Sequence, residues 1–296
     1  MTATVQPDAA PFAPFTLRLP EPGRAIPLVC DSPHSGTRYP ADFGHAIALA
    51  DLRAGEDTDV HVLWDALPAL GATLLAAEFP RSYIDPNRDA SDIDPGMLDG
   101  PWPGVVEASE KTRLGIGLIW RDAGPSGRQP IYDRRLAVAE VQARIANYHA
   151  PYQSRLLALI EEAYRRFGAV WHLNLHSMPA NSYEGLQIRS DKRLADFVLG
   201  DRDGATCAPE FTALVAKALR KHGFSVALND PFKGVALISR LGRPGQGRHS
   251  LQIEVHRGLY MDEATRARNA NFEPLRQALG AVANEIADYV RTTIPG

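Results

Sequence analysis

The chain has 296 residues, 45% of them hydrophobic and 23% charged, a composition typical of globular proteins. Its 32 Lys and Arg residues nearly balance 35 Asp and Glu residues, so the formal net charge is −3. This balance argues against a nucleic-acid or anionic-membrane partner, because both require a concentrated basic surface. A chain of about 300 residues can bury a large core within a single α/β domain.

The N-terminal segment differs from the rest of the chain. Residues 1–14 are rich in Pro and Ala and show no periodicity, so we expect a flexible leader followed by a single domain over residues 15–296. No basic start precedes an apolar stretch, and no apolar run approaches about 18 residues, so we expect a cytoplasmic protein. Cys30 and Cys207 are far apart and outside any C-x-x-C pattern, and we expect both to be buried apolar side chains.

Short apolar runs alternate with helical patterns along the domain, which predicts an α/β fold. In the first half of the chain, residues 26–30, 72–77 and 114–120 have the length and composition of buried strands. The proline-rich residues 80–104 are expected to form a long irregular segment. Long ordered loops are usually functional, so this segment is a candidate for binding or catalysis.

Two helical patterns follow. Between residues 133 and 167 the apolar positions keep a helical spacing, but Pro151 lacks a backbone N–H and should break or kink the helix. The apolar residues of 211–219 also recur with helical spacing. Pro209 stands in the first turn of this second helix and Gly223 stands just past its end, as helix boundaries favour.

The second half of the chain adds predicted strands at residues 170–175, 224–228 and 251–255 and a last helix at residues 262–290. The six predicted strands suffice for one sheet. The sequence contains no H-E-x-x-H, G-x-S-x-G, Walker A or G-x-G-x-x-G motif. Classical serine hydrolases and nucleotide-binding enzymes are therefore disfavoured.

Two histidines stand where predicted strands end. His34 follows the strand at 26–30, and His176 follows the strand at 170–175. The carboxyl ends of strands form the ligand crevice of α/β sheets. The two side chains could share one metal ion with a carboxylate and a water molecule, which is the arrangement of catalytic zinc. The alternative for each histidine is a loop residue hydrogen-bonded to the backbone.

Candidate carboxylates for such a site lie in residues 55–61. Glu56, Asp57 and Asp59 are all possible ligands, but acidic residues are also favoured in a first helical turn without any function. This pattern alone favours the helix cap and does not distinguish the three. His61 and His172 are expected to be structural, the latter on the same strand face as His176.

Two further groups of polar residues carry possible chemistry. Glu254 lies inside an apolar strand, where a carboxylate must pair with a cation or a metal site, or act as a general base. Arg81, Asn87 and Arg88 lie in the irregular segment, where guanidinium and amide groups could bind a carboxylate bidentately. The alternative is that they are solvated loop residues.

The combination of these motifs resembles the N-formylglutamate amidohydrolase family. The pieces occur in order over about residues 28–263: Ser-Pro-His-Ser-Gly at 32–36, Asp-Thr-Asp at 57–59, Arg81 with Ile-Asp-Pro-Asn-Arg at 84–88, Asn-Leu-His-Ser-Met-Pro at 174–179, and Gln-Ile-Glu-Val-His-Arg-Gly-Leu-Tyr-Met at 252–261. The resemblance implies a single three-layer α/β/α domain around a mixed sheet, similar to zinc carboxypeptidases.

The resemblance also implies a role for each candidate residue of the centre. His34, His176 and Asp57 would bind one zinc ion, with Asp57 preferred over Glu56 and Asp59. Glu254 would be the general base.

The same resemblance assigns substrate binding to the irregular segment. Asn87 and Arg88 would hold a substrate carboxylate, and Arg81 would polarise the scissile carbonyl or bind a second carboxylate. The sequence departs from the family pattern at Asn174, where many relatives have an acidic residue, and at His256, where they have Asn or another polar residue. The first departure concerns the orientation of a metal ligand rather than the presence of the metal.

The expected activity is zinc-dependent hydrolysis of N-formyl-L-glutamate to L-glutamate and formate, a step of histidine breakdown, on a small dicarboxylate substrate. One alternative is a related zinc hydrolase of another N-acyl amino acid or a peptide, because fold and metal do not fix the acyl group. Another is a catalytically silent member that binds a small acidic metabolite. The sequence does not indicate an oligomeric state.

Overall fold

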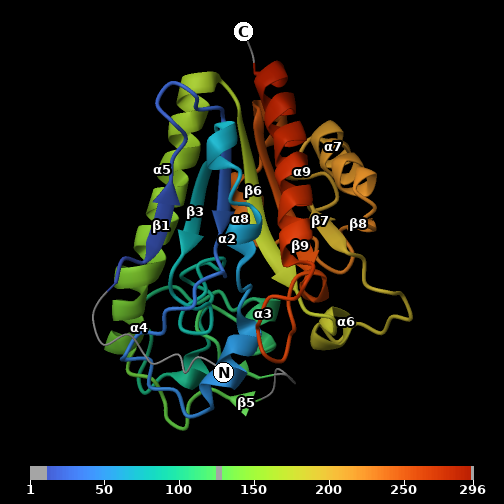
Figure 1. Cartoon of the computed structure of the whole chain (residues 1–296). Helices are drawn as coiled ribbons and strands as arrows, with labels where there is room; N and C mark the ends of the chain where they lie inside the picture. Colours follow the sequence, from blue (N-terminus) through green and yellow to red (C-terminus); the bar gives the residue numbers. More distant parts are fainter. Residues whose placement is uncertain (1–11, 125–128, 295–296) are drawn as a thin grey trace. The chain divides into compact units, whose positions relative to one another are not determined.

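The computed structural model describes residues 12–124 and 129–294 (Figure 1). Contacts between Cα atoms group the chain into two compact units, which are described separately. We call Met1–Thr16, Pro33–Thr58 and Ala77–Arg155 the loop unit. We call Leu17–Ser32, Asp59–Ala76 and Leu156–Gly296 the sheet unit. The expected single domain over residues 15–296 is not tested by this grouping and stays a prediction.

Most of the predicted leader, residues 1–11, lies outside the described residues. Residues 12–14 contact other residues of the loop unit. The ring centroid of Phe12 is 5.7 Å from that of Tyr148, and the carbonyl of Pro14 accepts a hydrogen bond of 3.0 Å from the N–H of Glu78.

A seven-stranded mixed sheet dominates the fold. Its order is β1 (Phe15–Arg18), β3 (Thr73–Ala77), β2 (Leu28–Ser32), β6 (Val170–Met178), β9 (Arg248–His256), β7 (Phe197–Gly200) and β8 (Val226–Leu228). Strands β3, β2, β6 and β9 are parallel to one another, whereas β7 is antiparallel to β9 and parallel to β8. The mixed sheet with its helices confirms the predicted α/β fold class.

The helices have the following bounds. In the chain order of the structure they are α1 (Leu49–Leu52), α2 (Val60–Leu63), α3 (Glu110–Arg113), α4 (Val138–Arg144), α5 (Ala150–Phe167), α6 (Ser182–Gly185), α7 (Pro209–Lys221), α8 (Ala236–Leu241) and α9 (Phe272–Thr293). A two-stranded antiparallel ladder of β4 (Asp122–Ala123) and β5 (Gln129–Pro130) belongs to the loop unit. None of the helices in the described ranges is long and apolar enough to cross a membrane.

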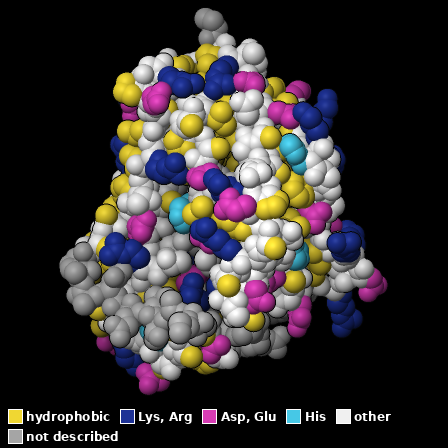
Figure 2. Space-filling view, viewed as in Figure 1, with side chains coloured by type: hydrophobic (Ala, Val, Ile, Leu, Met, Phe, Trp, Pro, Cys, Tyr) yellow, Lys and Arg dark blue, Asp and Glu magenta, His cyan; other side chains and the backbone are white. Residues whose placement is uncertain are grey.

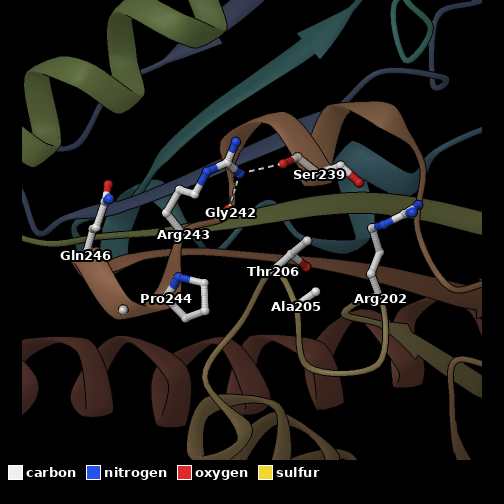
Figure 3. A pocket seen from close by; sticks show the side chains of 9 residues that line it. Arg202, Ala205, Thr206, Ser239, Gly242, Arg243, Pro244 and Gln246 are labelled. Carbon is white, nitrogen blue, oxygen red and sulfur yellow. Dashed lines mark hydrogen bonds between the residues drawn. The ribbon is translucent and has the colours of Figure 1, made fainter.

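The two faces of the sheet differ in polarity. One face packs against α2, α7 and α9 through a buried cluster that includes Leu28, Cys30, Leu173 and Ile253. Helix α8 lies on the other side of the sheet from α9 (Figure 3). Because side chains alternate along a strand, the face opposite this apolar cluster receives the intervening residues. Apolar residues such as Val29, Leu75 and Val198 are among them, together with seven buried polar residues: Asp31, His172, Asn174, His176, Ser250, Gln252 and Glu254.

Five of the six predicted strands coincide with β2, β3, β6, β8 and β9 within a few residues. The strand expected at residues 114–120 is wrong. Gly115 has a φ of +81° there, and its carbonyl accepts hydrogen bonds from the N–H groups of Arg121 and Asp122, so the chain turns. Strands β1 and β7, of four residues each, were not predicted.

The helix patterns were predicted better in their interiors than at their ends. Helix α7 begins at Pro209 and is followed by Gly223 with a φ of +85°, as expected. The helical pattern before it forms α4 and α5, joined by a π-helical turn at Ile145–His149. Pro151 is accommodated in the first turn of α5, directly after the wider hydrogen-bonding pattern of the π-helical turn.

The last helix begins at Phe272 rather than at Asp262. The side chain of Asp262 accepts hydrogen bonds from the N–H groups of Ala264 and Thr265, which closes a turn instead of a helix. Both cysteines are buried as predicted, and burial raises the pKa of the Cys207 thiol to about 12.

The surface agrees with the near-neutral charge balance. On the face shown in Figure 2, Lys and Arg side chains are interspersed with Asp and Glu side chains, and neither sign dominates.

The buried apolar face of β6 predicts a clear stability effect. Leu173 is fully buried in the apolar cluster, so Leu173→Ala should lower the free energy of unfolding by about 2–5 kcal/mol. Leu19 is 58% exposed, and Leu19→Ala should change it by about 0.5 kcal/mol or less. Urea denaturation measures both values, and equal effects would contradict the assigned core.

Candidate functional site

His34 lies in the loop unit, two residues after β2 ends at Ser32. Its Nε2 atom is 2.7 Å from Oδ1 of Asp85, and its Nδ1 atom is 3.4 Å from Oδ2 of Asp57. Both carboxylates can only accept hydrogen bonds, and only Asp85 is within hydrogen-bond distance, so a neutral His34 carries its proton on Nε2. The lone pair of Nδ1 is then directed toward the Asp57 carboxylate. Two buried electron-pair donors at this distance favour a cation between or beside them.

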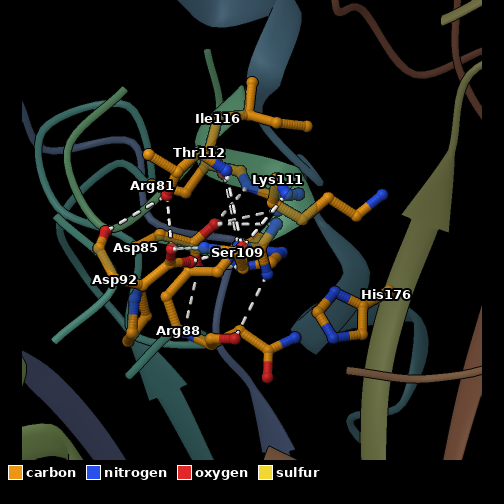
Figure 4. Close-up of polar contacts among 12 residues, drawn as sticks. Arg81, Asp85, Arg88, Asp92, Ser109, Lys111, Thr112, Ile116 and His176 are labelled. Atoms are coloured by element: carbon orange, nitrogen blue, oxygen red, sulfur yellow. Dashed lines mark hydrogen bonds and ion pairs between the residues drawn. The ribbon is translucent and has the colours of Figure 1, made fainter. Parts of the chain in front are cut away.

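Asp85 is the electrostatic centre of the loop unit (Figure 4). Burial alone would raise the pKa of this carboxyl group, but the nearby charges of Arg88, His34 and Arg81 hold it well below its usual value. Its Oδ2 atom lies 2.9 Å from Nη2 of Arg81 and 3.7 Å from Nη2 of Arg88. Asp85 therefore remains ionised and orients His34 and both arginines.

Asp85 is part of the Ile-Asp-Pro-Asn-Arg motif at residues 84–88, but the sequence analysis assigned no role to it. A carboxylate that lies between two arginines, in an irregular segment bounded by prolines, was the available signal.

The two arginines of the irregular segment contact other protein groups and are not solvated loop residues. Arg88 is 7% exposed and donates to the carbonyls of Ile116 and Asn87. The guanidinium of Arg81 lies 4.9 Å from the ring centroid of Trp120. The backbone N–H of Asn87 donates to Asp85 over 2.8 Å. The structure therefore brings Arg81, Asn87 and Arg88 together around Asp85.

The other two candidate carboxylates have partners of their own. Glu56 accepts hydrogen bonds from the hydroxyls of Tyr39 and Thr58, at 2.7 and 2.8 Å, and pairs with Arg53. In the sheet unit, Asp59 forms two hydrogen bonds with Arg268, of 2.7 and 2.9 Å. These contacts account for both carboxylates structurally. Asp57 alone of the three is beside His34.

His176 lies near the end of β6 in the sheet unit. Its Nε2 atom is 2.7 Å from Oδ1 of Asn174, and Nδ2 of Asn174 donates to Asp31 over 2.8 Å. His172 is on the same face, 2.9 Å from Asp31 and 2.8 Å from Ser250. These contacts agree with the structural role predicted for His172.

Glu254 is the register partner of His176 on the adjacent parallel strand. Its side chain is buried, and its Oε1 atom accepts a hydrogen bond of 2.7 Å from Nε2 of Gln252. His256, the second departure from the family pattern, accepts a hydrogen bond from the N–H of Gly258 and caps the turn at Arg257–Leu259. Its observed role is therefore structural.

His34 and Asp57 of the loop unit and His176 of the sheet unit are all buried, and each has the chemistry of a metal ligand. Asp85 and Asn174 already occupy the Nε2 atoms, so both histidines would ligate through Nδ1. Two imidazole nitrogens and one carboxylate oxygen fit the donor set of a catalytic zinc site.

The sheet unit also contains a pocket of about 410 Å³ that holds none of these residues (Figure 3). Arg243 donates to the carbonyls of Ser239 and Gly242 at its wall, and Arg202 donates to that of Gly234. The two guanidinium groups are thus engaged with the backbone of their own loops.

Comparisons with known proteins agree with the resemblance in the sequence. A family model described as N-formylglutamate amidohydrolase matches residues 26–261. An N-formylglutamate deformylase of Pseudomonas aeruginosa is 31% identical over 89% of this chain and 92% of its own length. A crystal structure of N-formylglutamate amidohydrolase from Ralstonia eutropha JMP134 is 59% identical, with a TM-score of 0.93 over 96% of this chain and 100% of that one.

A more distant crystal structure, of a protein from Agrobacterium tumefaciens, shares the fold alone. It is 18% identical, with a TM-score of 0.58 over 92% of this chain and 95% of that one.

The cluster around Asp85 predicts a large stability effect. Asp85→Asn leaves the buried Arg88 without its anionic partner, so the free energy of unfolding should fall by about 3–5 kcal/mol. The partly exposed pair of Arg121 and Asp122 is the control, and Asp122→Asn should cost about 1 kcal/mol or less. Urea denaturation in the presence of a metal chelator measures both, and similar losses would show that Asp85 is not the centre of this cluster.

Proposed function

Because the chain belongs to the N-formylglutamate amidohydrolase family, we propose that it hydrolyses N-formyl-L-glutamate to L-glutamate and formate. The observation that carries this proposal is the 59% identity with the Ralstonia eutropha amidohydrolase over almost the whole chain. The reaction would serve histidine breakdown, whose formylated intermediate is a dicarboxylate.

We propose that His34, Asp57 and His176 bind one zinc ion per chain. Support comes from the burial of all three side chains and from the acceptors that hold both Nε2 atoms. A bound zinc ion would supply polarisation of the formyl carbonyl and a lowered pKa for a water molecule. The protein contributes the fixed orientation of its ligands.

Glu254 is proposed as the general base. It would accept the proton of the attacking water and deliver it to the nitrogen of the leaving amine. Its register position beside His176 and the hydrogen bond from Gln252, which fixes the orientation of the carboxylate, support this role.

Asn87, Arg88 and Arg81 are proposed to bind the substrate carboxylates, with the polarisation of the scissile carbonyl as the alternative role of Arg81. Each of the two guanidinium groups can bind a carboxylate bidentately, which suits an anionic substrate. Asp85 holds both guanidinium groups in place before the substrate arrives. Binding therefore requires little further ordering of these side chains.

Formate release from N-formylglutamate, with N-acetylglutamate as the comparison substrate, tests the function. We expect rapid release from the formyl compound, little turnover of the acetyl compound, and loss of activity after chelation. Asp57→Asn should lose zinc and activity, whereas Asp59→Asn should keep both, because Asp59 is bound to Arg268. Equal turnover of both substrates would favour a broader N-acyl hydrolase, and intact zinc in Asp57→Asn would remove this residue from the ligand set.

Replacement of the proposed base should separate chemistry from metal binding. Glu254→Gln is nearly isosteric, so it should retain zinc and fold while kcat falls by about 10²-fold or more. Glu161, on α5, pairs with Arg248 at the start of β9, the strand that carries Glu254 near its end. Glu161→Gln is therefore the matched control, and its kcat should be unchanged. Zinc analysis and steady-state kinetics are the measurements. Loss of zinc from Glu254→Gln would make this residue a ligand instead.

A further inference from the structure

Asp31 is a fully buried carboxylate on the polar face of the sheet, outside the proposed ligand set. It lies on β2 and is the register partner of Asn174 on β6. Its Oδ1 atom receives the amide of Asn174 at 2.8 Å and Nε2 of His172 at 2.9 Å. Oδ1 of the same Asn174 lies 2.7 Å from Nε2 of His176. A hydrogen-bonded chain therefore connects Asp31 to a proposed metal ligand.

The chemistry of each group fixes the direction of this chain. An ionised carboxylate only accepts, so the NH2 group of Asn174 must face Asp31 and its oxygen must face His176. Facing an oxygen, Nε2 of His176 must be the donor. A neutral His176 then carries its proton on Nε2 and keeps the lone pair of Nδ1. Without the carboxylate, the amide could turn over, present its NH2 group to Nε2 and leave the proton on Nδ1.

The other end of the chain holds Asp31 in place. Nδ1 of His172 is 2.8 Å from Oγ of Ser250 on β9, so the imidazole is held between two strands while it contacts Asp31. Burying a carboxylate is costly, and two hydrogen bonds to one of its oxygens offset part of that cost. These hydrogen bonds connect three neighbouring strands, so the pairing of the strands in the sheet fixes the orientation of the Asn174 amide.

We propose that Asp31 is a positioning residue that, through the Asn174 amide, fixes the proton of His176 on Nε2 and so keeps Nδ1 ready to bind metal. The proposal rests on the proposed role of His176 as a ligand.

The first test reads the tautomer in the metal-free protein by ¹⁵N NMR of labelled histidine, with His176→Gln to assign the signals. The wild type should show His176 protonated on Nε2, and Asp31→Asn should show a mixture of the two neutral tautomers. Zinc affinity, measured by competition with a chromophoric chelator, should fall by roughly 10- to 100-fold in Asp31→Asn.

Two further variants separate positioning from stability. Asp201 is a buried carboxylate of the sheet unit that binds Thr212 and Asn229, so Asp201→Asn should destabilise the fold without changing the tautomer or the zinc affinity. The double variant Asp31→Asn with Asn174→Asp places the carboxylate directly beside His176. It should restore both the Nε2 proton and the zinc affinity.

An Asp31→Asn protein with the wild-type tautomer and a zinc affinity within about twofold of wild type would overturn the proposal. The proposal would also be overturned if the double variant failed to restore the Nε2 proton of His176 and the zinc affinity. If Asp31→Asn alone does not fold, the double variant is the deciding test. Because the tautomer is read without metal, it tests Asp31 even if zinc binding or formate release fails in the wild type.

Discussion

An ionised carboxylate can accept hydrogen bonds but cannot donate them, and the candidate site depends on this constraint. In the loop unit, Asp85 meets Nε2 of His34 directly. In the sheet unit, Asp31 reaches Nε2 of His176 through the amide of Asn174. Either way the histidine proton is placed on Nε2, and Nδ1 is left with its lone pair. The two units thus prepare their imidazoles in the same way with different side chains.

Burying these carboxylates has a cost that the surrounding residues offset. Asp85 is compensated by Arg81 and Arg88, the two residues proposed to bind the substrate carboxylates. Asp31 accepts hydrogen bonds from the Asn174 amide and the His172 imidazole. The difference fits the proposed roles, because one carboxylate organises substrate binding and the other only orients a ligand.

The sequence predicted what depends on local pattern and missed what depends on distant partners. His34 and His176 were found because polar residues at strand ends are a local signal. The choice among Glu56, Asp57 and Asp59 could not be made from pattern, since Arg268, which holds Asp59, is more than two hundred residues away in the chain. The resemblance to the family, rather than the pattern, favoured Asp57.

The same distinction explains the outcome for the fold. Helix α7 was predicted with its boundaries, because Pro209 and Gly223 are local signals, whereas the start of α9 was predicted ten residues too early. The apolar run at 114–120 has the composition of a strand, but the left-handed conformation of Gly115 turns the chain there. Asp85 does not belong to any periodic pattern in the sequence. Its role follows only from its contacts with Arg81, Arg88 and His34 in the structure.

The most direct measurement is a crystal structure of the zinc-loaded protein with anomalous data at the zinc edge. The account predicts one zinc peak per chain, bound by Nδ1 of His34, Nδ1 of His176 and a carboxylate oxygen of Asp57, with Nε2 of each histidine still held by Asp85 and Asn174. A zinc ion bound through Nε2 of either histidine, or no zinc at this group in an active protein, would contradict it.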